Sequence, residues 1–235
     1  MSLLSSLPTR EVAGITIPDT ALVNKTIAYV RDQVDDFTYN HVMRSFLFAI
    51  TFVPIVTASA PDYPIDYEVI AISTLLHDLA WAVSSDKCTP DKRFEVDSAN
   101  AARAFLVTET GNDASWPNHR VQVVWDAIAL HTTNSIAMHK QPEVMLAHIG
   151  ISADFIGPNI IPGGNGPLTP EMFNDAVSLF PRQNFKEGVR DLMCDLCKTK
   201  PQTTYDNFVG EYGDKYVEGY DRTGKKVIDF LETAI

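Results

Sequence analysis

The run at residues 69–83, VIAISTLLHDLAWAV, constrains the fold of this chain more than any other stretch. Apolar residues recur along it at steps of four and three positions, namely at Ile65, Val69, Ile72, Leu76 and Leu79. This is the period of one helix face and not the alternation of a strand, so the run predicts a helix with a buried stripe. His77 and Asp78 lie late in that helix, about 100° apart around its axis, where they point together into a cavity at the edge of the stripe.

Two interpretations of the pair at His77 and Asp78 follow from this position. An unpaired, ionised Asp beside an apolar run is costly to bury, and a divalent metal removes the cost for both residues at once. In the simpler alternative, the two side chains end the helix and meet water. A His-Asp dipeptide alone is a weak signal, so other residues must decide.

The composition favours one globular domain over residues 1–235. Hydrophobic residues make up 45% of the 235 residues and charged ones 21%, which is ordinary for a chain with a sizeable core. The formal net charge of −11 argues against binding to nucleic acid, since the chain lacks the basic surface that phosphate groups require. A small molecule is the expected partner.

The ends and the cysteines indicate a cytoplasmic protein. The first residues, MSLLSSLPTREVAG, have no basic region followed by a long apolar segment, so no secretory signal is expected. No apolar run is expected to be long enough to cross a membrane. Three cysteines cannot form a disulfide framework, which favours the reduced cytosol. Cys194 and Cys197 stand at helical spacing and are interpreted as two half-buried thiols and not as a metal or redox site.

The remaining patterns predict an all-α bundle of eight to ten helices without strands. An irregular arm is expected at residues 1–17. Helices are expected at residues 20–34, 41–56, 69–83, 94–110, 117–131, 142–154, 169–180, 184–198, 202–209 and 216–233. Pro54 is expected to kink or end the second of them. The loop at residues 157–170, rich in Gly and Pro, is expected to form a lid or a pocket wall.

Four residues at the ends or edges of these helices form a candidate metal site. His41 lies at the start of one helix, His77 and Asp78 late in another, and Asp154 near the end of a fourth. Two imidazoles and two carboxylates suit zinc, iron or manganese and leave positions open for water or substrate. Such a site is catalytic in type and not structural.

These residues resemble a known family. The order NHVMR, LLHDLAW and ADFIG is similar to the H…HD…D signature of the HD superfamily of metal-dependent hydrolases. RFEVDSANAARAF, AIALH, and ADFIG followed by FPR resemble the fungal cyanamide hydratase family, which adds water to a nitrile to make urea. The resemblance covers about residues 38–182 and implies the all-α HD bundle, with the helices of residues 183–235 beyond it.

The resemblance implies a ligand set and a metal. His41, His77, Asp78 and Asp154 would hold one zinc ion. At the place where relatives with two metals have a further histidine, this chain offers Glu95 or Asp97. One metal is therefore expected, and a dinuclear iron site is the alternative.

The chemistry expected of this site is the addition of water to cyanamide or a similar small nitrile-like compound. Zinc lowers the pKa of a bound water to near neutrality and so supplies a hydroxide nucleophile. Asp78 is expected to accept a proton as well as bind the metal, and His131 is the candidate proton donor or substrate-orienting group.

Several other side chains have two interpretations each. Arg44, one turn after His41, can reach a ligand carboxylate or an anionic substrate, or form a surface ion pair. Glu95 can fix the tautomer of an imidazole or be a plain exposed residue at a helix start. Trp81 and Phe155 are candidates for the pocket wall. The two histidines at positions 139 and 148 are interpreted as structural.

Three rival functions use the same residues. A phosphohydrolase acting on a nucleotide or another small phosphate ester needs cations, for which the chain offers Arg44, Lys87, Lys92 and Arg93. A diiron oxygenase needs two irons. A non-catalytic helical protein would use the metal for stability only. The apolar C-terminal helices would also suit a contact between copies of the chain in a homo-oligomer.

Overall fold

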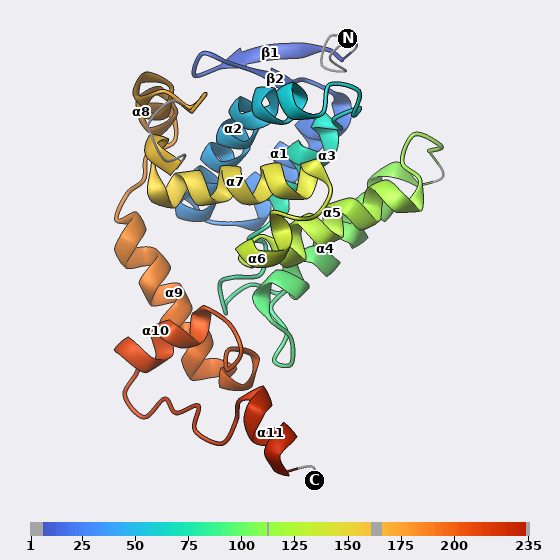
Figure 1. Ribbon diagram of the computed structural model, residues 1–235. Helices are drawn as coiled ribbons and strands as arrows, with labels where there is room; N and C mark the ends of the chain where they lie inside the picture. Colours follow the sequence, from blue (N-terminus) through green and yellow to red (C-terminus); the bar gives the residue numbers. More distant parts are fainter. Residues whose placement is uncertain (1–6, 112, 161–165, 234–235) are drawn as a thin grey trace.

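The computed structural model describes residues 7–111, 113–160 and 166–233. Over these residues the chain is mostly helical, with one two-stranded sheet (Figure 1), so the all-α prediction is confirmed at the level of fold class. The helices are α1 Ala21–Gln33, α2 Asp36–Ser59, α3 Tyr67–Leu76, α4 Phe94–Thr110, α5 Asn118–Leu130, α6 Asn134–Ala137, α7 Pro142–Ile156, α8 Pro170–Leu179, α9 Phe185–Thr199, α10 Val209–Tyr216 and α11 Val227–Thr233. Short 3-10 helices lie at Pro158–Ile160 and Pro201–Thr203.

The helix α2 is the centre of the bundle. Its N-terminus is capped by Asp35, whose side chain accepts a hydrogen bond from the amide of Thr38, so the helix begins five residues before His41. Pro54 lies inside the helix and does not end it. By length and composition α2 could cross a membrane, contrary to the expectation that no run is long enough. However, 72% of its apolar window is buried inside the protein, so most of this helix packs in the core.

The helix α7 packs across α2 (Figure 1), and the two backbones approach closely at Gly150. A Cβ atom added to Gly150 would lie 2.6 Å from Cα of Ala49, which is closer than side-chain atoms tolerate. Two side chains of the site described below flank this crossing. His41 lies eight residues before Ala49 on α2, and Asp154 lies four residues after Gly150 on α7. The close approach at Gly150 therefore helps to set the distance between them.

The helix α3 ends earlier than the apolar period predicts. It runs from Tyr67 to Leu76, and His77 is its C-cap, so His77 and Asp78 follow the helix and do not lie within it. Nδ1 of His77 bonds the carbonyl of Thr74 at 2.8 Å, which satisfies one of the carbonyls that a helix end leaves free. Both side chains are buried, so the interpretation in which they meet water is wrong.

The N-terminal arm is partly a β-hairpin and not irregular throughout, contrary to the prediction. The strand β1 Thr9–Val12 pairs antiparallel with β2 Ile15–Pro18, with Thr9 opposite Pro18 and Val12 opposite Ile15. Ala13 and Gly14 form the turn with φ of 51° and 71°, the left-handed values that tight hairpin turns need. Ile15 and Ile17 point into the core, which fixes the hairpin against the bundle.

The C-terminal third differs most from the prediction. Instead of helices at 202–209 and 216–233, a 3-10 turn precedes α10, and residues 217–226 form a connection before the short helix α11 (Figure 1). Gly219 and Gly224 in that connection have φ of 76° and 71°, which interrupts a helical pattern. Four apolar side chains of α11 are more than half exposed: Val227, Ile228, Phe230 and Leu231. A homo-oligomer contact there stays a prediction.

A buried ion pair fastens this C-terminal part to α4. Nζ of Lys200 lies 3.2 Å from Oδ2 of Asp97 and donates to the carbonyls of Thr89 and Lys92 at 3.0 and 2.9 Å. Lys200 is 2% exposed and Asp97 is 4% exposed.

The cysteines of α9 are buried and free, and Sγ of Cys197 donates to the carbonyl of Val209 at 3.2 Å.

Candidate metal centre

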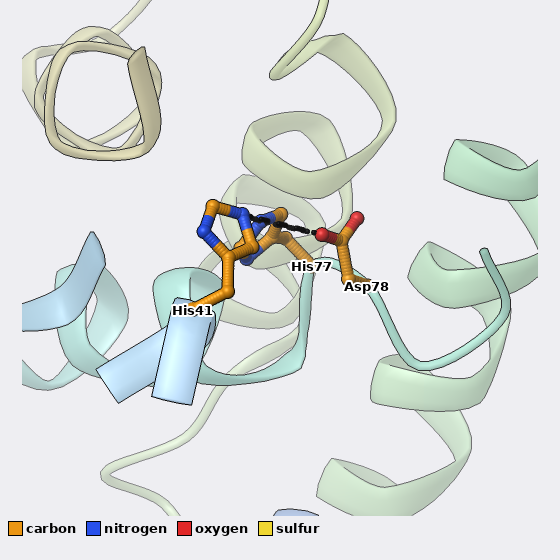
Figure 2. Close-up of side chains that lie close together, drawn as sticks. All are labelled: His41, His77 and Asp78. Carbon is orange, nitrogen blue, oxygen red and sulfur yellow. Dashed lines mark hydrogen bonds and ion pairs between the residues drawn. The ribbon is translucent and has the colours of Figure 1, made fainter. Parts of the chain in front are cut away.

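Three side chains from α2 and from the end of α3 meet at one buried point (Figure 2). Nε2 of His77 lies 3.2 Å from Nε2 of His41. Oδ2 of Asp78 lies 3.1 Å from Nε2 of His77 and 3.4 Å from Nε2 of His41. The two histidines are fully buried, and Asp78 is 2% exposed. These three residues therefore form a group that can hold a metal ion.

The geometry of this group fits a small divalent cation. A zinc ion held at about 2.0–2.1 Å by tetrahedral donors sets neighbouring donors about 3.3 Å apart, which matches the observed triangle. Oδ1 of Asp78 is buried and has no hydrogen-bond partner among the described residues, although buried polar atoms normally have one. A cation would compensate this carboxylate. The same donors suit iron or manganese, so they do not identify the metal.

The nitrogens that do not face the group hold each histidine ring in place. Nδ1 of His41 lies 2.7 Å from Oδ2 of Asp154, and Nδ1 of His77 donates to the carbonyl of Thr74. A donating nitrogen carries the ring proton, so Nε2 of the neutral ring keeps its lone pair. Nε2 of each ring faces Asp78: it donates a hydrogen bond to the carboxylate while it is protonated, and it can bind a metal once it is deprotonated.

Asp154 lies behind His41 and not among the three donors. Its Oδ1 accepts from Nε of Arg44 and its Oδ2 from Nη2 of Arg44, both at 2.7 Å, in addition to the contact with His41. In this arrangement the carboxylate orients His41. Its role as a direct ligand stays a prediction, since it does not belong to the group of three.

Arg44 is fully buried, so its interpretation as a surface ion pair is wrong. Besides Asp154, it contacts the carbonyls of Phe180 and Pro181 through Nη1, at 2.7 and 3.2 Å. The sequence-based expectation that Arg44 reaches a carboxylate of the site matches this arrangement. With its donors engaged in this way, Arg44 positions Asp154.

Charge and burial act in opposite directions on the acids and on His41. Burial alone lowers the pKa of His41, but its hydrogen bonds to Asp154 and Asp78 outweigh burial and raise the pKa above 6.5. Burial alone raises the pKa of Asp78, but the charge of His77 and hydrogen bonds from His41 and His77 lower it below the usual range. Burial also opposes the ionisation of Asp154, yet hydrogen bonds from His41 and Arg44 lower its pKa to about 2. Positive charge and hydrogen bonds from these neighbours therefore favour the ionised form of both acids.

His131 completes the polar end of the site. It follows α5, and its Nδ1 donates to the carbonyl of Ile128 at 2.7 Å, so the lone pair on Nε2 faces the site. Nε2 lies 3.8 Å from Oδ1 of Asp78. Burial, with the charge of His77 as the second cause, lowers the pKa of His131 to about 4. Two acceptors, Nε2 of His131 and Oδ1 of Asp78, therefore face each other and suit a molecule that donates to both.

Glu95 is buried at 1% exposure, so its interpretation as an exposed residue at a helix start is wrong. Its Oε1 accepts from Nη2 of Arg93 and from the hydroxyl of Thr132, both at 2.6 Å. In the described part of the chain it bonds no imidazole, and the tautomer of His131 is set by the carbonyl of Ile128 instead. Glu95 is therefore linked to the cavity through Thr132, which lines the cavity next to His131.

A cavity of about 260 Å³ lies over the three donors. Trp81 and Phe155 line it, as expected from the sequence. Trp81 stacks on the ring of His41 with centroids 5.4 Å apart, and Phe155 meets that ring edge-on at 5.3 Å. His148, interpreted from the sequence as structural only, also lines the cavity, and its Nδ1 donates to the carbonyl of His131 at 2.6 Å.

The far wall of the cavity comes from the C-terminal helices, which sequence reasoning did not connect with the site. Its residues are Val189, Met193, Phe208 and Tyr212. Their spacing on α9 and α10 is also that of ordinary core residues, so the sequence held no separate signal for them. The loop at 157–170 was the expected wall, but its described residues do not line the cavity, and residues 161–165 lie outside the described part.

The cations proposed for phosphate binding do not line the cavity. Arg44 is held by Asp154, Arg93 by Glu95, Lys87 by Gln33 and Asp86, and Lys92 by Asp91. Within the described ranges, the cavity lining contains no lysine or arginine. Arg182 and Lys186 line a neighbouring hollow that shares Phe155, Val189 and Tyr212 with the cavity.

The sequence matches no model of a known protein family, and no curated protein matches it. The fold and the site therefore define the class to which the protein belongs. It is a mostly helical protein with a buried His-His-Asp group, able to hold a metal ion, at the floor of a cavity.

Proposed function

We propose that this protein is a metal-dependent hydratase of the HD superfamily that adds water to cyanamide or a similar small nitrile-like compound. The observation that carries the proposal is the convergence of Nε2 of His41, Nε2 of His77 and Oδ2 of Asp78 at the polar end of a largely apolar cavity. The signature residues found in the sequence support the family assignment. Zinc is the proposed metal, with iron and manganese as alternatives.

In the proposed reaction the oxygen of water bonds to the nitrile carbon, and the two protons of water end on the former nitrile nitrogen after tautomerisation. Cyanamide would thus give urea. A zinc ion held by the three donors would act as a Lewis acid and make a water molecule nucleophilic near neutral pH. The residues of the chain have to orient that water, accept its proton and pass the proton to nitrogen.

Asp78 and His131 are the groups proposed for this proton transfer. Both offer acceptors to the same space, Oδ1 of Asp78 and Nε2 of His131, 3.8 Å apart. A water that donates to both presents its oxygen lone pair to the electrophilic carbon. Because Nδ1 of His131 is held by a carbonyl, the ring takes up a proton at Nε2 and returns it from the same atom.

Metal analysis with a product assay tests this proposal. We expect the purified protein to contain about one zinc per chain and to release urea from cyanamide. His77→Ala should lose both the metal and the activity. His131→Ala should keep the metal and lose most of the turnover, by about 10²-fold or more. His139→Ala is the matched control, since His139 is exposed, and it should change neither.

Two rival functions predict other results of the same assay. A phosphohydrolase would release phosphate from a nucleotide or a small phosphate ester, and the absence of cationic lining among the described residues does not favour it. An oxygenase would contain iron and consume oxygen. Two histidines and one carboxylate are also the donors of non-haem iron sites, so that candidate has support from the same triangle.

A further inference from the structure

The lining of the cavity has a polar and an apolar part. The polar part includes the three metal-binding candidates and His131. The apolar part includes side chains from three elements: Ile151, Phe155, Val189, Met193 and Phe208. A small polar molecule would leave water against these apolar side chains, which is unfavourable. The apolar lining therefore favours a substrate that has an apolar part.

The cavity is also larger than cyanamide requires. A water molecule takes about 30 Å³, and cyanamide, with one carbon and two nitrogens as its heavy atoms, is of the order of two or three waters in size. The cavity volume of about 260 Å³ is several times greater. It is just below the roughly 300 Å³ at which pockets accommodate drug-sized ligands. Most of the space thus lies beyond any reacting nitrile group.

We infer that the substrate of this site is a nitrile-type compound with an uncharged apolar substituent, aromatic or branched alkyl, that packs against the apolar part of the cavity lining. The inference rests on the proposed hydratase function. The substituent is uncharged because, over the described residues, neither lysine nor arginine lines the cavity. It is apolar because Val189 and Met193 face the space, and both are at least 95% buried in the protein.

Binding energy from such a remote substituent contributes to catalysis when it orients the reacting group. Cyanamide has no apolar substituent, and acetonitrile has only a methyl group. Phenylacetonitrile has the same reacting group as acetonitrile and adds one phenyl ring. Because a single methylene in a hydrophobic pocket changes kcat/KM about 10-fold or more, a ring should change it at least as much.

The first experiment measures amide formation by the zinc-loaded full chain from acetonitrile, phenylacetonitrile and cyanamide. We expect kcat/KM for phenylacetonitrile to exceed that for acetonitrile by at least about tenfold. Hydration of cyanamide or acetonitrile with equal or greater kcat/KM would overturn the inference while the hydratase proposal stands.

A second measurement separates this inference from the hydratase proposal. Phenylacetonitrile and acetonitrile are titrated calorimetrically into the metal-free protein, where no hydration is required. Selective binding of phenylacetonitrile supports an apolar occupant even if no nitrile is hydrated, in which case the hydratase proposal alone fails. Equal or absent binding of both compounds, with no preference in turnover, overturns the inference.

Variants of the far wall make the test specific. Val189→Phe should narrow the cavity beside its apolar lining and lower the ratio of kcat/KM for phenylacetonitrile over acetonitrile by at least about tenfold. Phe208→Ala removes one aromatic side chain from the lining and should lower the same ratio. This second variant tests the inference if Val189→Phe does not fold. Asp191→Ala, an exposed position on the same helix, is the control. An unchanged ratio in a folded wall variant would contradict the inference.

Discussion

Nδ1 of His41 lies 2.7 Å from Oδ2 of Asp154, and this contact joins α2 to α7 at the fully buried edge of the candidate metal site. Asp154 in turn receives two hydrogen bonds from Arg44, so its carboxylate cannot rotate without breaking them. The hydrogen bonds from Arg44 to Asp154, and the contact of Asp154 with His41, thus fix which imidazole nitrogen of His41 faces Asp78. A divalent metal bound by His41 would depend on these contacts for the orientation of its ligand.

Replacing Asp154 by Asn tests how that orientation contributes to metal binding. The amide keeps the size of the side chain but loses the charge that pairs with Arg44. If Asp154 orients His41, zinc affinity should fall about 10- to 100-fold without being abolished. The measurement is a competition titration against a chelator.

Asp175→Asn, an exposed acid on α8, is the matched control and should bind zinc as the wild type does. Complete loss of zinc in Asp154→Asn, with the fold intact, would instead identify Asp154 as a direct ligand, as the sequence signature predicts.

Gly150→Ala should destabilise the protein because α2 and α7 cannot approach as closely. The new Cβ would lie 2.6 Å from Cα of Ala49, which is backbone and cannot move aside alone. We expect a loss of about 1–3 kcal/mol in the free energy of unfolding, measured in urea. Gly188→Ala, whose Cβ meets only the ring of Phe37, should cost less, and equal losses would contradict the argument.

The low pKa of His131 predicts how the stability of the metal-free protein depends on pH. Between pH 6.5 and about 4 this histidine binds a proton in the unfolded chain but not in the folded one. The free energy of unfolding should therefore fall as the pH decreases through this window, by roughly 3 kcal/mol from this residue. Denaturation curves at several pH values measure it. His131→Gln should have a flatter pH profile, and parallel profiles would refute the assignment.

Metal uptake should release a proton. Against the effect of burial, the hydrogen bonds to Asp154 and Asp78 raise the pKa of His41, so this imidazole keeps its second ring proton to a higher pH than a free histidine does, and a metal that binds Nε2 has to displace that proton. Apparent zinc affinity should therefore decrease as the pH falls, by about tenfold per pH unit for one proton. Calorimetry in buffers with different ionisation enthalpies counts the released protons. Zinc binding without proton release would show that His41 is neutral or does not bind.

Lys200→Met should weaken the attachment of the C-terminal part. Removing the ammonium leaves Asp97 buried without its ion-pair partner, which typically costs about 3–5 kcal/mol. Thermal unfolding compares this variant with Lys198→Met, an exposed control on the same segment. Similar stability in both variants would mean that the pair contributes little.

The sequence predicted those features that local patterns determine. The helices at 94–110 and 169–180 were placed to within one residue, because Gly111 ends the first and Thr169 caps the second. The candidate group at His41, His77 and Asp78 could also be proposed, because these residues follow the order of the H…HD…D signature, and the structure brings the three together.

Features that depend on tertiary packing could not be predicted in this way. The hairpin at residues 9–18 has strands of only four residues, too short for a clear sequence pattern. The two strands pair with each other and pack against the core through Ile15 and Ile17. Val189 and Met193 have the spacing of any amphipathic helix, and only the position of α9 brings them to the cavity. The position of Asp154 behind His41 depends on the crossing of α2 and α7 at Gly150.

Anomalous X-ray scattering at the zinc absorption edge, from crystals of the protein as purified, would show where the metal binds. We predict one peak at about 2.0–2.1 Å from Nε2 of His41, Nε2 of His77 and a carboxylate oxygen of Asp78. The absence of a peak from this point in metal-replete crystals, or a peak that touches none of these three side chains, would contradict the proposed metal centre.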